Sequence, residues 1–182
     1  MKKINQKIFL IIALLVLIPL VAAFVSSKNN KTKLENKTFD PRVYIAVVND
    51  EGIKREDYKK RQGQRSYFKK WLIEHNTTST VLTKSVLETM IEETLSLKFA
   101  QENNLIPSQK EVERKYFAAV KSVGTEEQYL TRIKDLQGQN KDNILKQMEF
   151  EIIQTKIEKK TKMPYSVWIK EQKIKAEIEK YD

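Results

Sequence analysis

The chain has 182 residues, with 34 Lys and Arg against 24 Asp and Glu, a formal net charge of +10, no cysteine and one histidine. This length suits one domain, and a hydrophobic content of 40% is too high for a chain that is disordered throughout. The missing cysteines exclude disulfides, thiolate catalysis and cysteine-ligated metals, and a single histidine excludes sites that need a histidine pair. Only four glycines and four prolines favour long helices over a turn-rich β-sandwich or barrel.

Residues 1–27 have the pattern of an export signal or a membrane anchor. The first seven residues include three lysines and no acid, and an uncharged run follows from Ile8 to Ser27. About 20 apolar residues are enough to span a bilayer, while Val21-Ala22-Ala23 offers the small side chains of a signal-peptide cleavage site. An uncleaved anchor and a cleaved signal peptide both remain open. In either case we expect the rest of the chain outside the cytoplasm, either held by one span of the inner membrane or released into the periplasm.

A polar linker, residues 28–41, separates this segment from the predicted domain at residues 42–182. The linker is rich in Asn, Lys and Thr and shows no apolar periodicity. The next segment, Arg42–Asn49, is β-branched and aromatic, which predicts a strand. Asp50-Glu51-Gly52 then predicts a turn in which the glycine adopts a positive φ.

Six helices are predicted after this strand, because apolar residues recur at helical spacing in each segment. Their expected ranges are about 54–75, 80–103, 108–123, 125–137, 142–161 and 165–175. Ser108-x-x-Glu111 and Thr125-x-x-Gln128 match the capping box, in which two side chains satisfy free backbone N–H groups of the first turn. The third and fourth helices should therefore begin at these motifs.

The end of the chain, Ala176–Glu179, alternates in polarity like a short strand. Two isolated strands at opposite ends of a helical domain each carry backbone groups that need hydrogen-bond partners. We therefore predict that Val43–Val48 pairs with Ala176–Glu179 in a small two-stranded sheet, which brings the two ends of the domain together.

An ordered series of segments resembles the N-terminal module of extracytoplasmic chaperones of the SurA and PrsA type. The order and spacing of these segments carry the resemblance, and the end of the chain is similar to the final helix and strand of the same proteins. The segments are Val47–Tyr58, Val86–Leu95, Asn104–Val112, Thr125–Tyr129, Met148–Lys160 and, at the end, Trp168–Ile178. The resemblance implies a mainly α, multi-helix SurA N-like chaperone domain with the small terminal sheet.

The chain departs from many of these relatives by omitting a domain. A parvulin-type prolyl isomerase domain usually separates the last two blocks, which here nearly abut at Met163-Pro164. Parvulin-type sites use several histidines, whereas His75 lies alone in a polar stretch and suits a solvated loop. The resemblance therefore implies a protein that is not an enzyme and uses no cofactor.

The resemblance also implies an ATP-independent chaperone that binds unfolded or nascent exported polypeptides and is attached to the membrane by its N-terminal helix. Tyr67, Trp71, Tyr116 and Phe117 are the candidate client-binding residues, because amphipathic aromatic side chains suit variable partners. The alternative for each of them is the ordinary hydrophobic core. A rival interpretation of the whole protein is a membrane-anchored scaffold or assembly subunit with one fixed protein partner. Neither interpretation involves nucleic acid, a metal or a small-molecule substrate.

Two charged clusters are better explained as ordinary helix surfaces than as catalytic or binding sites. Glu88, Glu92 and Glu93 could perform acid–base work or bind a cation, but without a further ligand type they suit a solvated helix face. The basic segment from Lys59 to Lys70 includes aromatic residues, as nucleic-acid patches do, but the expected location argues against that partner. Its lysine stems should flank a core-facing stripe, with anionic lipid or acidic client segments as alternative partners.

Overall fold

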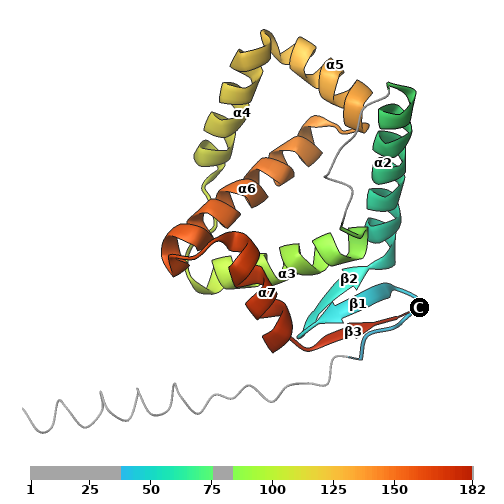
Figure 1. Ribbon diagram of the computed structural model, residues 1–182, viewed down its shortest axis with the longest axis vertical. Helices are drawn as coiled ribbons and strands as arrows, with labels where there is room; N and C mark the ends of the chain where they lie inside the picture. The colour runs from blue at the N-terminus through green and yellow to red at the C-terminus, as the bar shows by residue number, and fades with distance from the viewer. Residues whose placement is uncertain (1–37, 76–83, 182) are drawn as a thin grey trace, which may run out of the picture. The chain divides into compact units, whose positions relative to one another are not determined.

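The computed structural model describes residues 38–75 and 84–181 (Figure 1). The chain divides into two units, residues 1–38 and 39–182, and the second unit contains all of the helices and strands described below. The predicted signal or anchor at 1–27 and most of the predicted linker lie outside the described residues. Within the described ranges, no helix is both long enough and apolar enough to cross a bilayer.

Three short strands form one antiparallel sheet in the order β2-β1-β3, from β1 (Tyr44–Val48), β2 (Glu51–Lys54) and β3 (Ile178–Lys180). Val48 lies opposite Ile178, and Ala46 lies opposite Lys180. The predicted pairing of the two ends of the domain is therefore confirmed. The sheet has three strands instead of the predicted two, because the chain folds back on β1 directly after Asp50.

The turn between β1 and β2 differs from the prediction that Gly52 supplies the positive φ. Asn49 takes the left-handed conformation, with a φ of 56°, whereas Gly52 lies in β2 opposite Val47. Asparagine tolerates this conformation better than most residues, so the turn needs no glycine. The glycine is needed for space instead, because a Cβ at position 52 would collide with the ring of Tyr44.

The described part of the chain contains six helices, which are α2 (Arg55–Glu74), α3 (Val86–Glu102), α4 (Gln109–Val123), α5 (Glu126–Gln137), α6 (Lys141–Thr161) and α7 (Tyr165–Lys175). All six predicted helices are present, and five have bounds within a few residues of the expected ones. The exception is α3, which begins at Val86 after the Ser85 cap, while part of the predicted first turn, residues 80–83, lies outside the described residues.

Both predicted capping boxes form. At the start of α4, Glu111 donates its backbone N–H to Ser108 Oγ, and the Ser108 N–H donates to Glu111 Oε2 at 2.8 Å. Thr125 and Gln128 make the equivalent pair at the start of α5. These local hydrogen bonds explain why the bounds of α4 and α5 could be predicted from short motifs.

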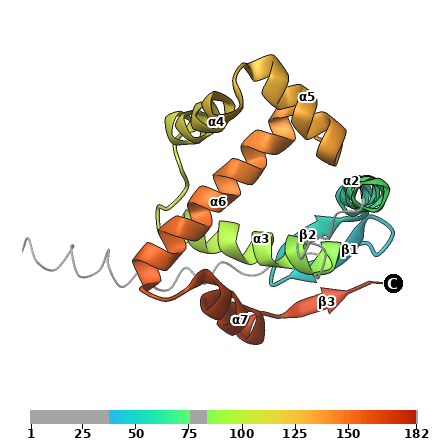
Figure 2. The same cartoon turned by 45° about the horizontal axis from the view of Figure 1, so that its top comes forward.

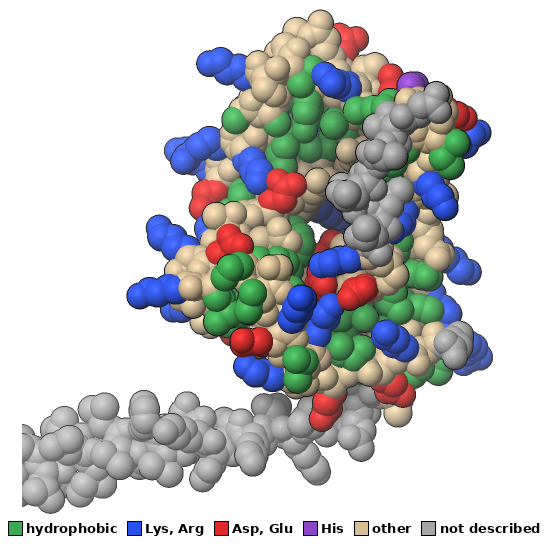
Figure 3. All heavy atoms as spheres, viewed as in Figure 1, with side chains coloured by type: hydrophobic (Ala, Val, Ile, Leu, Met, Phe, Trp, Pro, Cys, Tyr) green, Lys and Arg blue, Asp and Glu red, His purple; other side chains and the backbone are tan. Residues whose placement is uncertain are grey.

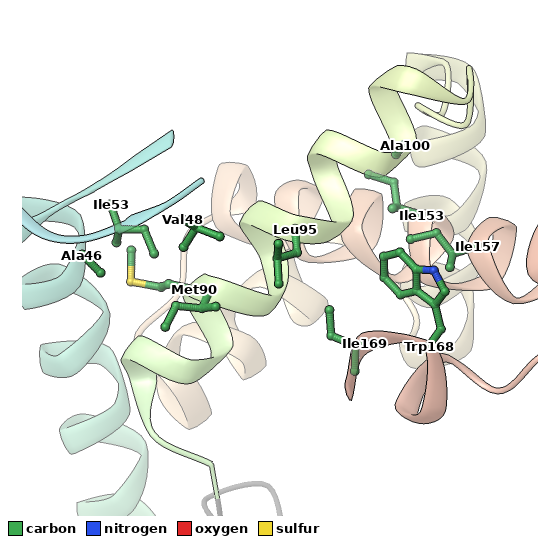
Figure 4. Packing of buried hydrophobic residues seen from close by; sticks show 11 residues of the cluster. Ala46, Val48, Ile53, Met90, Leu95, Ala100, Ile153, Ile157, Trp168 and Ile169 are labelled. Carbon is green, nitrogen blue, oxygen red and sulfur yellow. The ribbon is translucent and has the colours of Figure 1, made fainter. Parts of the chain in front are cut away.

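Buried apolar residues form two clusters, and α6 belongs to both. The first cluster joins the sheet, α3, α7 and the second half of α6, where Ile153 and Ile157 are fully buried. Figure 4 shows Trp168 of α7 beside these two isoleucines, with Met90 of α3 next to the strand residues. The second cluster joins α4, α5 and the first half of α6 around Ile144 and Met148 (Figure 2). Because α6 contributes residues to both clusters, it connects the two cores.

The helix α2 is the least buried of the six. Leu72 is the one residue of α2 that is fully buried, and the helix contacts the sheet at its start, α3, and α5 near its end (Figure 1). Arg55 fixes the start of the helix through a backbone hydrogen bond to Val43 O at 2.8 Å and a side-chain bond to Pro41 O at 2.6 Å. Long faces of α2 are left open to solvent.

Candidate functional site

An open groove lies between the last turns of α2 and one face of α5. It holds a volume of about 610 Å³. Its lining combines one large aromatic surface with donors, acceptors and charges of both signs. The lining residues are Trp71, His75, Glu127, Gln128, Thr131, Arg132, Asp135 and Leu136.

Trp71 and His75 form the α2 side of the groove, and Tyr67 lies one helical turn before Trp71. Tyr67, Trp71 and His75 follow one another on the same side of the helix, as the helical repeat requires. The indole of Trp71 stacks on the imidazole of His75, with ring centroids 4.1 Å apart, and His75 Nδ1 lies 2.9 Å from the carbonyl oxygen of Trp71. His75 is exposed, but the stacking orients its ring. The pair forms a flat, partly apolar wall.

Tyr67 holds α2 against the end of α5. Its hydroxyl donates to the Asp135 carbonyl oxygen at 3.3 Å, and its ring covers Gly138, where an added Cβ would lie 3.3 Å from Cδ1. Gly138 ends α5 in the left-handed conformation, with a φ of 62°. Tyr67 therefore sets the spacing of the two groove walls while remaining 48% exposed.

The four candidate aromatic residues occupy three different environments. Trp71 lines the groove, whereas Tyr67 is not a lining residue and packs against Asp135 and Gly138 at the end of α5. Tyr116 is only 1% exposed and belongs to the second core, which is the alternative that the sequence left open. Phe117 is 55% exposed on α4, with its ring 5.5 Å from that of Tyr116, and it does not line the groove. Of the four residues, Trp71 lines the groove and Tyr67 holds its two walls together.

Tyr116 has a structural hydrogen bond in the second core. Its hydroxyl donates to Glu126 Oε1 at 2.8 Å, and Lys141 Nζ pairs with the same oxygen at 2.7 Å. Burial, followed by the bond to Glu126, raises the pKa of Tyr116 to about 12. The tyrosine therefore stays protonated and joins α4 to the start of α5.

The α5 wall was missed by reasoning from the sequence. Gln128, Thr131, Arg132 and Asp135 are exposed polar residues, and such residues on a helix normally signal only a solvated face. The available signal was their position on one side of the helix, away from the buried Tyr129. These residues form a groove wall only because α2 packs against α5, which the sequence does not show.

The prediction that Glu88, Glu92 and Glu93 form a solvated face is wrong for Glu92, which is only 5% exposed. Lys84 Nζ donates to both Glu92 carboxylate oxygens, at 2.8 and 3.0 Å, and Lys173 Nζ donates to Glu92 at 3.1 Å and to Glu88 at 2.7 Å. The hydrogen bond from Lys173 is the main reason that the pKa of Glu88 is lowered, and that bond also raises the pKa of Lys173. The cluster connects α7 to α3.

The third acid of this cluster points toward a different helix. Arg61 of α2 makes two short contacts with the Glu93 carboxylate, at 2.6 and 2.7 Å. Such a bidentate pair fixes both distance and orientation. Across the described ranges, no group of three acidic or histidine residues is arranged to hold a metal ion. The acids of α3 therefore hold neighbouring helices in place.

A family model described as the SurA-like N-terminal domain matches residues 1–158, which include the sheet strands β1 and β2 and most of the helices, but not α7 or β3. Searches of curated proteins and of solved structures found no match.

Proposed function

We propose that this chain, which belongs to the family of SurA-like N-terminal domains, binds unfolded or exported polypeptides outside the cytoplasm and holds them without a nucleotide. Domains of this kind are associated with chaperone-type or peptide-binding roles in general, are generally extracytoplasmic, and are not themselves catalytic.

The groove between α2 and α5 is the observation that supports polypeptide binding best. The Trp71–His75 wall offers an apolar surface to one side chain of a bound segment. Facing it, Gln128 and Arg132 can donate hydrogen bonds, while Asp135 can accept them, so backbone groups of any sequence can be satisfied. A wide, open site with these properties suits weak binding that does not depend on one sequence.

Phe117 supplies a second exposed aromatic surface, on α4. It is the most exposed aromatic residue among the large hydrophobic residues of the described ranges. A long unfolded segment can contact separate apolar positions at once, and each additional contact raises the overall affinity without a new deep pocket. We therefore include Tyr67, Trp71 and Phe117 among the client-contacting residues and assign Tyr116 to the core.

The decisive experiment measures the aggregation of several unrelated unfolded proteins in the presence of the full chain. We expect the chain to slow aggregation of each, and we expect Trp71→Ala and Thr131→Trp to weaken the effect. Thr131→Trp fills the groove from an exposed position and so removes no buried atoms. Thr155→Trp is the matched control, because it adds the same ring at an exposed position of α6 that does not line the groove.

Salt separates an apolar mechanism from an electrostatic one. Apolar contact is not screened by salt, whereas attraction between charged surfaces weakens as ionic strength rises. Holding should therefore persist at high salt. Loss of holding at high salt, or no protection of any client, would contradict the proposed mechanism. The melting temperature of each variant must be measured, because truncation of a packed tryptophan can by itself cost about 3–5 kcal/mol.

The scaffold function remains the second candidate. Val167 and Ile174 on α7 are 47% and 84% exposed, and α7 lies outside the residues that match the family model. An exposed apolar face of this kind suits one fixed protein partner. Binding of a single partner that Ile174→Ala abolishes, without protection of unrelated clients, would favour the scaffold.

We further propose that residues 1–27 direct the protein to the cell envelope, either as a retained anchor or as a cleaved signal. Flotation of membranes together with N-terminal sequencing of the mature protein tests both forms. A retained anchor gives a membrane-bound protein that keeps its first residues. A cleaved signal gives a soluble protein that begins soon after the Val21-Ala22-Ala23 segment.

A further inference from the structure

One side of α2 carries lysines and no acids. Six exposed residues of this helix lie within a sector of about 100°, since successive residues of an α-helix are rotated by about 100°. The acidic residues Glu56, Asp57 and Glu74 project outside that sector, although Glu74 forms an exposed ion pair with Lys70 at a long N–O distance of 3.8 Å. We call the sector the outer face of α2. Its residues are Lys59, Gln62, Ser66, Lys69, Lys70 and Ile73.

The rest of the fold holds this face outward. On the opposite side of the helix, Leu72 is buried and Arg61 makes its bidentate pair with Glu93 of α3. The two ends of α2 are held by Arg55 at the sheet and by Tyr67 at α5. Figure 3 shows Lys and Arg side chains projecting along the edge that α2 forms. The helix therefore cannot turn its lysines inward without breaking these contacts.

We propose that the outer face of α2 docks on the anionic headgroups of a lipid bilayer, the same bilayer that residues 8–27 would enter. This proposal rests on the proposed location in the cell envelope and on the retained-anchor form of residues 1–27. Lysines near an anionic surface are attracted to it, and their apolar stems allow the ammonium groups to reach the headgroups while the helix lies on the surface. Ile73, 67% exposed at the end of the face, can enter the boundary between headgroups and acyl chains.

Chain length makes this docking geometrically possible. The folded unit begins at Phe39, and α2 starts next to this entry point, because Arg55 bonds to Pro41. Residues 28–38 can span at most about 40 Å when fully extended, while a helix of 20 residues is about 30 Å long. Anchoring through residues 8–27 therefore leaves the whole outer face within reach of the bilayer surface.

The charge of the connecting segment favours lipid over an acidic protein partner. Residues 28–37 contain four lysines and one glutamate, so the chain between the apolar run and the folded unit is attracted to the same surface. An anionic bilayer would also be present at a high effective concentration for a tethered domain, whereas a separate acidic protein would not.

A single label on the outer face tests the proposal, because the chain has no cysteine. Ser66→Cys carries a fluorophore in the full chain, which is reconstituted in vesicles of phosphatidylcholine alone or of equal parts phosphatidylcholine and phosphatidylglycerol. We expect the label to be protected from acrylamide, a neutral quencher, in the anionic vesicles only, and to lose this protection at high salt. Ser166→Cys, exposed on α7, is the control position and should show no protection.

A charge variant tests the contribution of the lysines. Lys59→Gln/Lys69→Gln/Lys70→Gln should weaken docking about a hundredfold, since each lysine near an anionic surface contributes a factor of about five. The matched control is Lys110→Gln/Lys121→Gln/Lys134→Gln, which removes the same charge from exposed positions of α4 and α5 and should leave docking unchanged.

Several results would overturn the docking proposal. One is equal quenching of the Ser66→Cys label in neutral and anionic vesicles, and another is an equal loss of docking in the two triple lysine variants. The proposal would also fail if the chain floated with neither kind of vesicle, or if polyglutamate protected the label and anionic vesicles did not. The last result would assign the outer face to acidic polypeptides. Client holding is measured separately with the same lysine variants, and we expect it to be unchanged. Loss of docking with intact holding, or the reverse, shows which of the two proposals has failed.

Discussion

At the scale of single residues, Glu92 carries the most concentrated charge network of the described chain. Its carboxylate is buried and accepts hydrogen bonds from Lys84 and Lys173, while Lys173 also reaches Glu88. A buried charge is tolerated only when its partners remain, so removal of one partner is more harmful than the net value of the pair suggests. The network holds α7 on α3 as long as it is complete.

We predict that Lys173→Met lowers the free energy of unfolding by about 2–3 kcal/mol, somewhat less than for a fully buried pair because Glu92 keeps Lys84. The matched control is Lys175→Met, whose i,i+4 pair with Glu171 has a long N–O distance of 3.9 Å and an exposed setting, and it should cost less than about 0.5 kcal/mol. Urea unfolding measures both. Equal losses in the two variants would contradict a special role of the network.

Glu111 supports a second prediction at this scale. The pKa of Glu111 is lowered from 4.5 to about 2. The largest cause is the hydrogen bond from Lys156, and the hydrogen bonds from Ser108 are the next largest. Because the pKa is lower in the folded state, the stabilisation is complete above the unfolded value and is lost as the pH falls from about 5 toward 2. NMR titration should place the Glu111 pKa near 2, and Lys156→Met should raise it. A Glu111 pKa of 4.5 in the native protein would contradict the assignment.

At the scale of elements, α2 is an exposed helix with a glycine in its interior. An added Cβ at Gly63 meets nothing within 4 Å, whereas one at Gly138 meets the Tyr67 ring, and Gly138 also has a positive φ. Alanine costs less conformational entropy than glycine in a helix but is strained in the left-handed region. The same substitution should therefore have opposite effects at the two positions.

We predict that Gly63→Ala raises the free energy of unfolding by about 0.5–1 kcal/mol. Gly138→Ala should lower it by at least about 1 kcal/mol, because it combines backbone strain with a close approach to Tyr67. Thermal and urea unfolding test the pair. Stabilisation by both substitutions would show that Gly138 does not need its left-handed conformation.

At the scale of the whole molecule, the two ends of the folded unit stabilise each other. Asn49 N donates to Glu177 O at 2.7 Å, Tyr181 N donates to Ile45 O at 2.8 Å, and Arg55 donates to the Tyr181 carbonyl oxygen at 3.1 Å. These bonds join residues more than a hundred positions apart.

We predict that removal of residues 174–182 lowers the free energy of unfolding by a few kcal/mol. The truncation deletes β3 and leaves the outer backbone groups of β1 without their partners, and each lost backbone bond costs about 0.5–1.5 kcal/mol. The urea midpoint measures the effect. An unchanged midpoint would mean that the pairing of the two ends contributes little to the stability of the fold.

Features that depend on nearby residues could be predicted from the sequence. The capping motifs at Ser108 and Thr125 set the starts of α4 and α5, because their hydrogen bonds span only three residues. The pairing of the strands at the two ends of the domain could also be predicted, because the backbone groups of each strand need hydrogen-bond partners. The family resemblance was confirmed over residues 1–158.

Contacts between distant segments determine which residues of similar type share an environment. Tyr116 and Phe117 are neighbours in the sequence, yet one is buried in the second core and the other faces solvent. The sequence predicts a solvated Glu92, whereas in the fold α7 places Lys173 within hydrogen-bond distance of its carboxylate. The groove exists because Tyr67 of α2 packs against the end of α5, about 70 residues away. Each of these outcomes depends on contacts between distant segments, and local periodicity carries no information about which faces of two helices will meet.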